Sequence, residues 1–253
     1  MIKKILSVAT ISVLTIVIAG CCCSPTMISD YFSAKSQAEK ALSEAEKRMS
    51  ATTGAIVQPP AVKQESGATD LVKNGNFADG LTDWETRTQG GSKVEGTNSV
   101  EVVQAGNAYT LKVSRTDGGG DGGGAYASQT INKDVITYSS LVIKLAVNVI
   151  SEEGGNLANT NPQWFPEGAC QIRIYYTDTT GAKAEKYQGF YSTTISNADT
   201  AHFTQVSGGQ WYSYTSPNLM DGSPKPKTIE KIEVYGYGWG FEGYMTNVQL
   251  LVK

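Results

Sequence analysis

From residue 70 to the end of the chain, apolar and polar residues alternate in short runs that are rich in Val, Ile, Tyr and Thr. Gly, Asn, Asp and Pro separate these runs, and no helix of useful length is indicated between them. Alternation with a period of two is typical of half-buried β-strands. The pattern predicts strands over 109–115, 141–150, 170–178, 210–216, 228–240 and 245–253.

A segment of about 184 residues built in this way most simply folds as two packed sheets. We therefore expect residues 70–253 to form an all-β, two-sheet antiparallel sandwich of jelly-roll type. The segment is long enough to bury one core without disulfides. Its single cysteine, Cys170, stands in an apolar run and is expected to be buried.

The region before this domain has a different pattern of apolar and charged residues. Between residues 29 and 50 apolar positions recur at gaps of three and four, and the pairs Lys35–Glu39 and Glu44–Arg48 place opposite charges one turn apart. This predicts a short amphipathic helix, either a lone solvated helix or a short self-associating stalk. Residues 51–69 contain Pro59 and Pro60 and are expected to be a linker.

The first residues combine two lysines, an uncharged apolar run over 5–19, small residues, and then Cys21. The apolar run is too short to span a bilayer. The segment resembles the signal peptide of bacterial lipoproteins, which implies removal of residues 1–20, a lipid on Cys21, and 21–50 as lipidated anchor and stalk. An ordinary signal peptide is the alternative.

No aspartate follows Cys21, as in lipoproteins sorted to the outer membrane. We therefore expect an extracytoplasmic protein of the cell envelope, at the outer membrane where there are two membranes. The sequence leaves the role of Cys22 and Cys23 open.

The net charge of the whole chain is −3. Residues 1–69 hold seven Lys/Arg and five Asp/Glu, so residues 70–253 hold fourteen and nineteen, a net charge of −5. No basic stripe is present, which argues against a nucleic-acid partner. It also means that the lipid, rather than surface charge, would hold the protein at the membrane.

Catalytic patterns are weak. The single histidine, His202, has neither a nucleophile elbow nearby nor a second histidine with which to bind a metal, and no pair of carboxylates stands out. The glycine-rich run over 118–124 lacks the ending of a phosphate-binding loop. It is either a plain connection or a lip over a binding face. We expect no enzyme, no cofactor and no metal.

Two short motifs stand at the two ends of the predicted domain. Asn74-Gly75-Asn76-Phe77 is followed by Gly80 and Trp84, and Thr246-Asn247-Val248-Gln249-Leu250 lies near the end of the chain. They resemble the first and last strands of carbohydrate-binding modules of families 4 and 9, within the galactose-binding-like jelly rolls. Residues 172–192 resemble a hairpin of related bacterial surface domains, with Gly181 in its turn. The resemblance implies that the first and last strands pair, with Phe77 in the core, Gly75 at a tight bend and Trp84 over the sandwich edge. Many such modules have acidic residues that help hold calcium where this chain has Ala78 and Thr246, so we do not expect that metal site.

The aromatic residues between 164 and 244 suggest what the domain binds. In 171–176 Gln, Arg and Tyr alternate with apolar residues, and in 233–239 Glu, two Tyr and Trp share one face. Rings beside amide and charged groups match the C–H patches and hydroxyls of a sugar. An alternative is that these are ordinary strand residues on a half-wet surface. We expect a non-catalytic module that binds a glycan, with ring stacking by Trp164, Tyr237 and Trp239. Arg173 and Gln188 would orient the sugar. The other hypothesis is an envelope scaffold that binds protein through this face or the helix. The expected ligand-binding residues are Trp164, Arg173, Tyr175, Gln188, Tyr235, Tyr237 and Trp239.

Overall fold

The computed structural model describes residues 58–61, 66–90, 96–116, 118, 120–153, 157–158, 166–196 and 198–253. The chain divides into two compact units, residues 1–54 and 55–253, and all described residues belong to the second. The expected signal peptide, Cys21 and the helix over 29–50 lie outside the described residues. In the part that is described, no helix has the length and apolar character needed to span a membrane.

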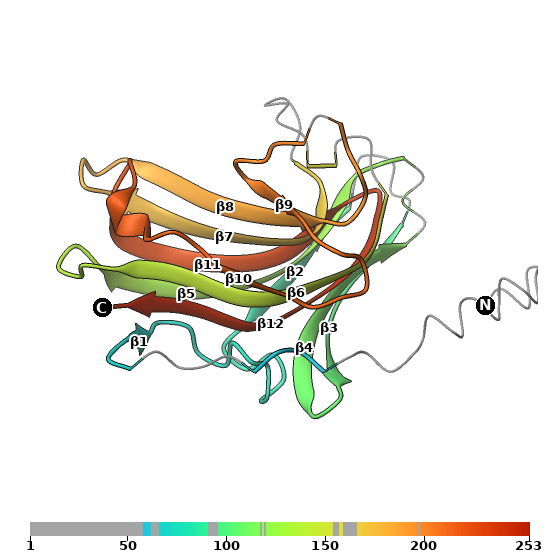
Figure 1. Cartoon of the computed structure of the whole chain (residues 1–253), viewed down its shortest axis with the longest axis horizontal. Coiled ribbons are helices and arrows are strands. Elements are labelled where there is room, and N and C mark those ends of the chain that lie inside the picture. Colours follow the sequence, from blue (N-terminus) through green and yellow to red (C-terminus); the bar gives the residue numbers. More distant parts are fainter. Residues whose placement is uncertain are drawn as a thin grey trace, which may run out of the picture. The chain divides into compact units, whose positions relative to one another are not determined.

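The second unit is built from strands and one short 3-10 helix, η1 (Leu219–Asp221) (Figure 1). The strands are β1 (Thr69–Asp70), β2 (Glu85–Gln89), β3 (Thr97–Ala105), β4 (Ala108–Thr116), β5 (Gly123–Asp134), β6 (Leu141–Glu153), β7 (Gly168–Asp178), β8 (Lys183–Tyr191), β9 (Phe203–Gln205), β10 (Tyr212–Thr215), β11 (Pro226–Gly238) and β12 (Gly240–Val252).

The strands form two sheets. Sheet A has the order β10-β6-β12-β4-β3, with β1 added beside β12, and sheet B has the order β2-β5-β11-β7-β8-β9. All the paired strands are antiparallel except β8 and β9, which run parallel. The expected two-sheet antiparallel sandwich is confirmed.

The core lies between the sheets and takes one side of each alternating strand. Ile172 and Ile174 of β7 and Ile232 and Val234 of β11 are fully buried, as the period-two pattern requires. Cys170 is buried among them, as expected, and burial raises the pKa of its thiol. Each of the six predicted strands corresponds to an observed one, with ends shifted by a few residues. The hairpin with Gly181 in its turn is β7–β8.

The two motifs at the ends of the domain meet, as the resemblance implied. Thr69 and Asp70 pair with the end of β12, and the Val248 amide donates to the Gly75 carbonyl at 2.9 Å. A Cβ on Gly75 would stand 1.9 Å from the Val248 carbonyl oxygen. Gly75 lies in the tight bend that was expected, where the Phe77 amide donates to the Asn74 carbonyl at 3.1 Å, and it also permits close backbone approach to the last strand.

Phe77 is the expected core residue. It is fully buried, and its ring lies 5.3 Å from that of Trp84, measured between centroids. The indole Nε1 of Trp84 donates to the Asn74 carbonyl at 3.1 Å, so Trp84 ties the turn after β1 to the sandwich.

The described part of the expected linker rests on the sandwich. Pro59 is buried, and the side-chain amide of Asn247 donates to the Pro60 carbonyl at 3.1 Å. Pro59 and Pro60, which belong to the expected linker, are thus in contact with the domain.

Candidate ligand-binding site

The outward side of sheet B carries the polar and aromatic residues that alternation predicted. On β7 these are Gln171, Arg173 and Tyr175; on β11 they are Glu233 and Tyr235, and Tyr237 continues the same alternation. The register places Glu233 opposite Arg173 and Tyr235 opposite Gln171. The pairing of β7 with β11 therefore brings these side chains together on one surface.

Two further strands extend this face. Tyr126 of β5 lies opposite Tyr235, and Arg87 of β2 lies opposite Tyr126. The Arg87 guanidinium carbon lies 3.6 Å from the centre of the Tyr126 ring. The Tyr126 and Tyr235 rings are stacked with centroids 5.2 Å apart and planes inclined by 17°. The Arg173 guanidinium carbon lies 5.0 Å from the centre of Tyr235.

Beyond Arg173 the row of flat groups continues toward the edge of the sheet. The Arg173 guanidinium carbon is 5.9 Å from the Tyr187 ring of β8, and Tyr187 stacks on His202 with centroids 4.6 Å apart. The imidazole of His202 is held by Asp199, with 2.7 Å between Nδ1 and Oδ2. Flat groups from Arg87 to His202 therefore contact one another across the sheet. Much of their ring surface is used inside the row.

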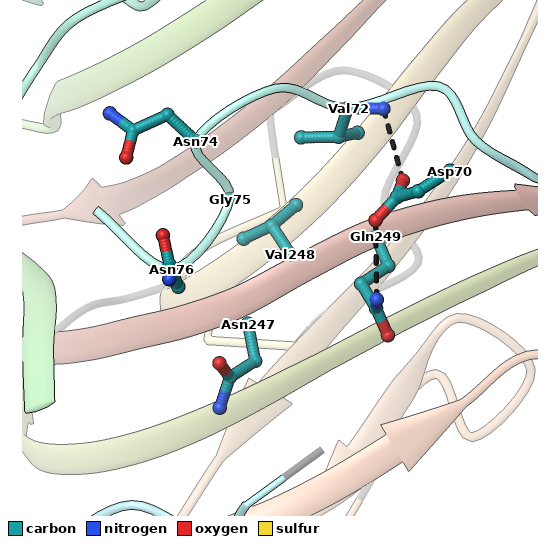
Figure 2. A pocket seen from close by; sticks show the side chains of 8 residues that line it. All are labelled: Asp70, Val72, Asn74, Gly75, Asn76, Asn247, Val248 and Gln249. Atoms are coloured by element: carbon teal, nitrogen blue, oxygen red, sulfur yellow. Dashed lines mark hydrogen bonds between the residues drawn. The ribbon is translucent and has the colours of Figure 1, made fainter. Parts of the chain in front are cut away.

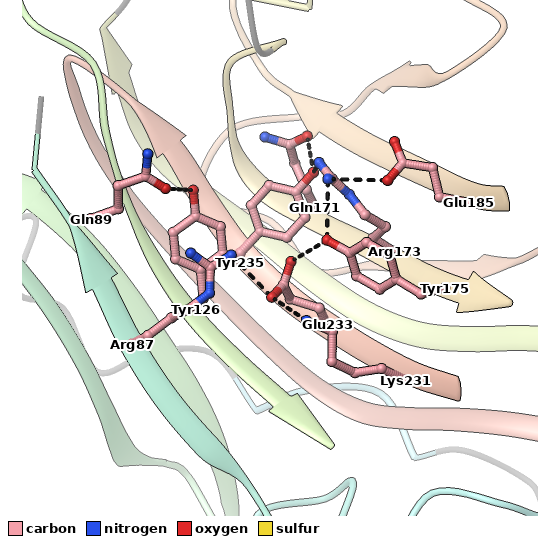
Figure 3. A network of polar contacts seen from close by, with 10 residues as sticks. All are labelled: Arg87, Gln89, Tyr126, Gln171, Arg173, Tyr175, Glu185, Lys231, Glu233 and Tyr235. Carbon is pink, nitrogen blue, oxygen red and sulfur yellow. Dashed lines mark hydrogen bonds and ion pairs between the residues drawn. The ribbon is translucent and has the colours of Figure 1, made fainter. Parts of the chain in front are cut away.

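A hydrogen-bond network lies below and beside this row (Figure 3). Glu233 is fully buried; its Oε1 accepts from Arg87 at 3.2 Å and from Lys231 at 3.4 Å, and its Oε2 accepts from the Tyr175 hydroxyl at 3.2 Å. A buried carboxylate is costly unless it is paired and hydrogen-bonded. Glu233 meets both conditions, so it can anchor its neighbours. We call these ten residues the outer-face network: Arg87, Gln89, Tyr126, Gln171, Arg173, Tyr175, Glu185, Lys231, Glu233 and Tyr235.

Arg173 is the centre of the network. Its Nη2 donates to the Tyr235 hydroxyl at 2.5 Å, and its Nη1 lies 3.3 Å from the Tyr175 hydroxyl and 3.4 Å from Glu185 Oε2. The Tyr235 hydroxyl in turn donates to the Gln171 side-chain oxygen at 3.1 Å. The remaining donor of the guanidinium, Nε, is buried without a hydrogen-bond partner.

The phenols of this face are kept neutral by their surroundings. Burial raises the pKa of Tyr126 to about 12, although the nearby Arg87 guanidinium opposes the rise. Burial also raises the pKa of Tyr235, against the opposing effect of Arg173. Both hydroxyls therefore remain protonated at neutral pH and can donate and accept hydrogen bonds.

The outer-face network borders a cavity of about 220 Å³. It is lined by the following residues: Arg87, Gln89, Tyr126, Pro166, Arg173, Tyr175, Tyr235 and Tyr237. The walls offer phenol hydroxyls, guanidinium N–H groups and an amide to whatever enters. This face is therefore hollowed at its centre.

The seven expected site residues divide into four groups, the last of which is Gln188. Arg173, Tyr175, Tyr235 and Tyr237 line the cavity together. Trp239 does not belong to the alternating face, because β11 ends at Gly238 and Trp239 occupies the turn into β12 with 36% of its surface exposed. Trp164 lies outside the described residues.

Gln188 was expected beside Arg173, but it lies on the other side of β8. It pairs with the core residue Ile172, whereas Arg173 pairs with Tyr187. The Gln188 side-chain oxygen accepts from the Tyr214 hydroxyl of sheet A at 3.3 Å. Gln188 therefore bridges the two sheets at their edge and is not brought to the cavity.

Sequence reasoning missed Arg87, Gln89 and Tyr126. Strand β2 is fully exposed, and β5 begins with Gly123 and Gly124, so neither had an obvious strand signal. The alternation of alanine with Tyr126 and Ser128 was the available sign. The glycine-rich run connects β4 to β5, and a Cβ on Gly122 would stand 3.1 Å from the Tyr237 hydroxyl. The described part of the run thus lies beside the cavity, as a lip would.

A second polar pocket, of about 330 Å³, lies where the first and last strands meet (Figure 2). Asp70 is the one carboxylate in its lining; Oδ1 accepts from the Val72 and Leu250 amides at 3.0 Å, and Oδ2 accepts from Gln249 Nε2 at 3.2 Å. These bonds join β1 to β12. We call this the closure pocket, lined by Asp70, Val72, Asn74, Gly75, Asn76, Asn247, Val248 and Gln249.

Solved structures with a similar arrangement include carbohydrate-binding modules. The family 11 module of a cellulosomal cellulase of Clostridium thermocellum has 12% identity and a TM-score of 0.43, with 75% of this chain and 97% of that chain covered. A xylan-binding domain of family 22 from Paenibacillus barcinonensis has 12% identity and a TM-score of 0.40, with 75% and 97% covered.

A β-1,2-glucanase from Parabacteroides distasonis has 12% identity and a TM-score of 0.37, with 66% of this chain but 23% of that chain covered. No protein-family model matches the sequence, and no curated protein matches it. The likeness is one of general β-sandwich architecture. The sugars bound by those modules do not identify a ligand for this chain.

Proposed function

We propose that residues 70–253 are a non-catalytic module that binds a glycan in the cavity on the outer face of sheet B. The observation that supports this most is the hollow itself, which is bounded by phenols, guanidinium groups and an amide. A sugar hydroxyl both donates and accepts hydrogen bonds, and these walls provide both functions. A flat aromatic patch would instead favour a protein partner, the alternative held by the scaffold hypothesis.

The proposed recognition relies on ring edges and hydroxyls more than on ring faces. The faces of Tyr126 and Tyr235 contact each other and the two arginines. Their hydroxyls, with Arg173 and Gln89, would orient the sugar. The mechanism thus shifts from the tryptophan stacking suggested by the sequence to a polar site with prearranged donors.

A glycan array probed with the full chain tests this function, followed by affinity electrophoresis with the best glycan. Tyr235→Phe keeps the ring stack but removes the hydroxyl between Arg173 and Gln171. We expect its affinity to fall about tenfold, the scale of one hydrogen bond to a charged group. No glycan binding, together with a protein partner captured from envelope extract and lost in Tyr235→Phe, would favour the scaffold hypothesis instead.

We also propose that a lipid on Cys21 anchors this module at the outside of a bacterial membrane. The support is the order of basic residues, apolar run, small residues and cysteine. Cys21→Ala should abolish incorporation of labelled fatty acid and release the protein from the membrane fraction. Continued labelling would mean that Cys22 or Cys23 is the acceptor.

A further inference from the structure

The cavity on the outer face has an unusual balance of charge. Among its eight lining residues are two arginines, Arg87 and Arg173, and no aspartate or glutamate. Residues 70–253 carry fourteen Lys/Arg against nineteen Asp/Glu, a net charge of −5. The cavity is therefore a locally cationic site in an acidic domain, and such a site favours an anionic group.

The carboxylates near the cavity do not cancel this charge. Glu233 is fully buried, and its oxygens already accept from Arg87, Lys231 and Tyr175. The Glu185 carboxylate lies 3.4 Å from Arg173, but 45% of its side chain is exposed, so solvent weakens that pair. The outer-face network holds three cations and two carboxylates. Glu167, Asp121 and Arg115 also lie near Tyr237, but none of these three residues lines the cavity.

Arg173 also has a donor to spare. Its Nε is buried and without a hydrogen-bond partner, while the side chain is only 12% exposed. A buried N–H that lacks an acceptor costs free energy, and a ligand oxygen would recover it only where a shift of the Arg173 side chain exposes Nε. Guanidinium donors match carboxylate and sulfate oxygens in both charge and geometry.

The size of the cavity limits what can supply that anion. At about 220 Å³ it is smaller than typical ligand pockets of roughly 300–1,000 Å³. A cavity of this size can hold only a small part of a glycan, and the rest of a chain would lie outside it. Tyr126 and Tyr235 lie between the two guanidinium groups, so one anion binds to only one of them, and Arg173 is the less exposed of the two. Resting on the proposed glycan-binding function, we infer that the cavity takes an anionic sugar, with its carboxylate or sulfate held by Arg173.

Calorimetric titration of the full chain in detergent tests the inference with three probes of equal length: an oligogalacturonate, a sulfated oligogalactose and a neutral oligogalactose. We expect at least one charged probe to bind about tenfold more tightly than the neutral one, because charge-assisted hydrogen bonds are about twice as strong as neutral ones. The preference should shrink as salt is added. The stronger charged probe identifies the anion as a carboxylate or a sulfate.

Two variants and one matched control show which residues cause the preference for the charged probe. Arg173→Gln should remove most of the preference for the charged probe, and Arg87→Gln should remove less of it, because two stacked rings separate Arg87 from Arg173. Lys231→Gln removes the same charge from the network, at a residue that does not line the cavity. It should keep the preference.

Three outcomes would overturn the inference, each in a different way. Equal or tighter binding of the neutral probe would contradict it and leave glycan binding intact. Equal losses in Lys231→Gln and Arg173→Gln would mean that net charge acts, not the arginine site. Failure of every sugar on the array would contradict the proposed function as well.

Discussion

The closure pocket and the outer-face network are both polar clusters on the same sandwich, but their hydrogen bonds have different partners. In the closure pocket the side chains serve the backbone: Asp70 accepts from two main-chain amides, and Asn74 donates to the carbonyls of Gly80 and Thr82. In the outer-face network side chains bond mainly to other side chains, through Arg173, Glu233 and Tyr235.

This difference suggests different roles: the closure pocket stabilises the fold, and the outer-face network can exchange its hydrogen bonds for those of a ligand. Bonds between two side chains make up only about 10–15% of those in folded proteins, so a concentration of them at one face is uncommon. Backbone groups must be satisfied wherever they are buried, whereas a side-chain network can be deleted without opening a strand pair. Mutations in the closure pocket should therefore change stability, and mutations in the network should change binding.

The largest expected effect is at Gly75. Gly75→Ala would place a Cβ 1.9 Å from the Val248 carbonyl oxygen, a backbone atom that cannot move without displacing β12. We expect a loss of about 3 kcal/mol or more in the free energy of unfolding, at the upper end of overpacking costs. Urea unfolding measures it. Gly90→Ala is the control, because Gly90 has open space around it and no positive φ, and a normal unfolding midpoint for Gly75→Ala would contradict this explanation.

The alternation of polar and apolar residues explains which parts of the structure could be predicted from the sequence. It separates Arg173 from Ile172 within one strand, and so predicted both the core and the polar face of β7 and β11. It does not reveal which strands are neighbours, and the contact of Arg87 with Tyr126 depends on the pairing of β2 with β5. Gln188 was misplaced because the parity of β8 relative to β7 is set by the turn between them.

The second prediction concerns Asp70. Asp70→Ala would leave the Val72 and Leu250 amides without their acceptor, and we expect a loss of about 2 kcal/mol in the free energy of unfolding. Asp70→Asn is the matched control: its oxygen still accepts from both amides, and its NH₂ can donate to the Gln249 Oε1 once the Gln249 side-chain amide turns over. Thermal unfolding should rank Asp70→Asn close to wild type. Glycan affinity should be unchanged in both variants.

The third prediction compares the two sides of β11. Val234→Ala removes two methyl groups from a fully buried side chain and should cost about 1–3 kcal/mol of stability without changing intrinsic affinity. Tyr237→Ala removes a wall of the cavity and should weaken glycan binding by about 1–3 kcal/mol with little change in stability. Denaturant titration and calorimetry measure the two effects. The reverse pattern would mean that the cavity face is the true core.

The smallest expected effect is the alkaline titration of Tyr126. Its pKa is raised by burial from 10.0 to about 12 in the folded protein, so the folded state disfavours the phenolate that the unfolded chain readily forms. The contribution of the neutral Tyr126 phenol to the free energy of unfolding is therefore complete below pH 10. It is lost as the pH rises toward 12, because in this range the unfolded state is stabilised by releasing the phenol proton and the folded state is not. Free energies of unfolding, measured by urea titration at a series of alkaline pH values, should begin to fall near pH 9.0, where the Cys170 thiol of the unfolded chain ionises, and should fall more steeply above pH 10. Tyr126→Phe cannot ionise and should make this decline shallower, while ultraviolet absorbance should show one late-titrating phenol fewer. An equally steep decline in Tyr126→Phe would mean that Tyr126 titrates normally and that the Arg87–Tyr126–Tyr235 stack is open to water.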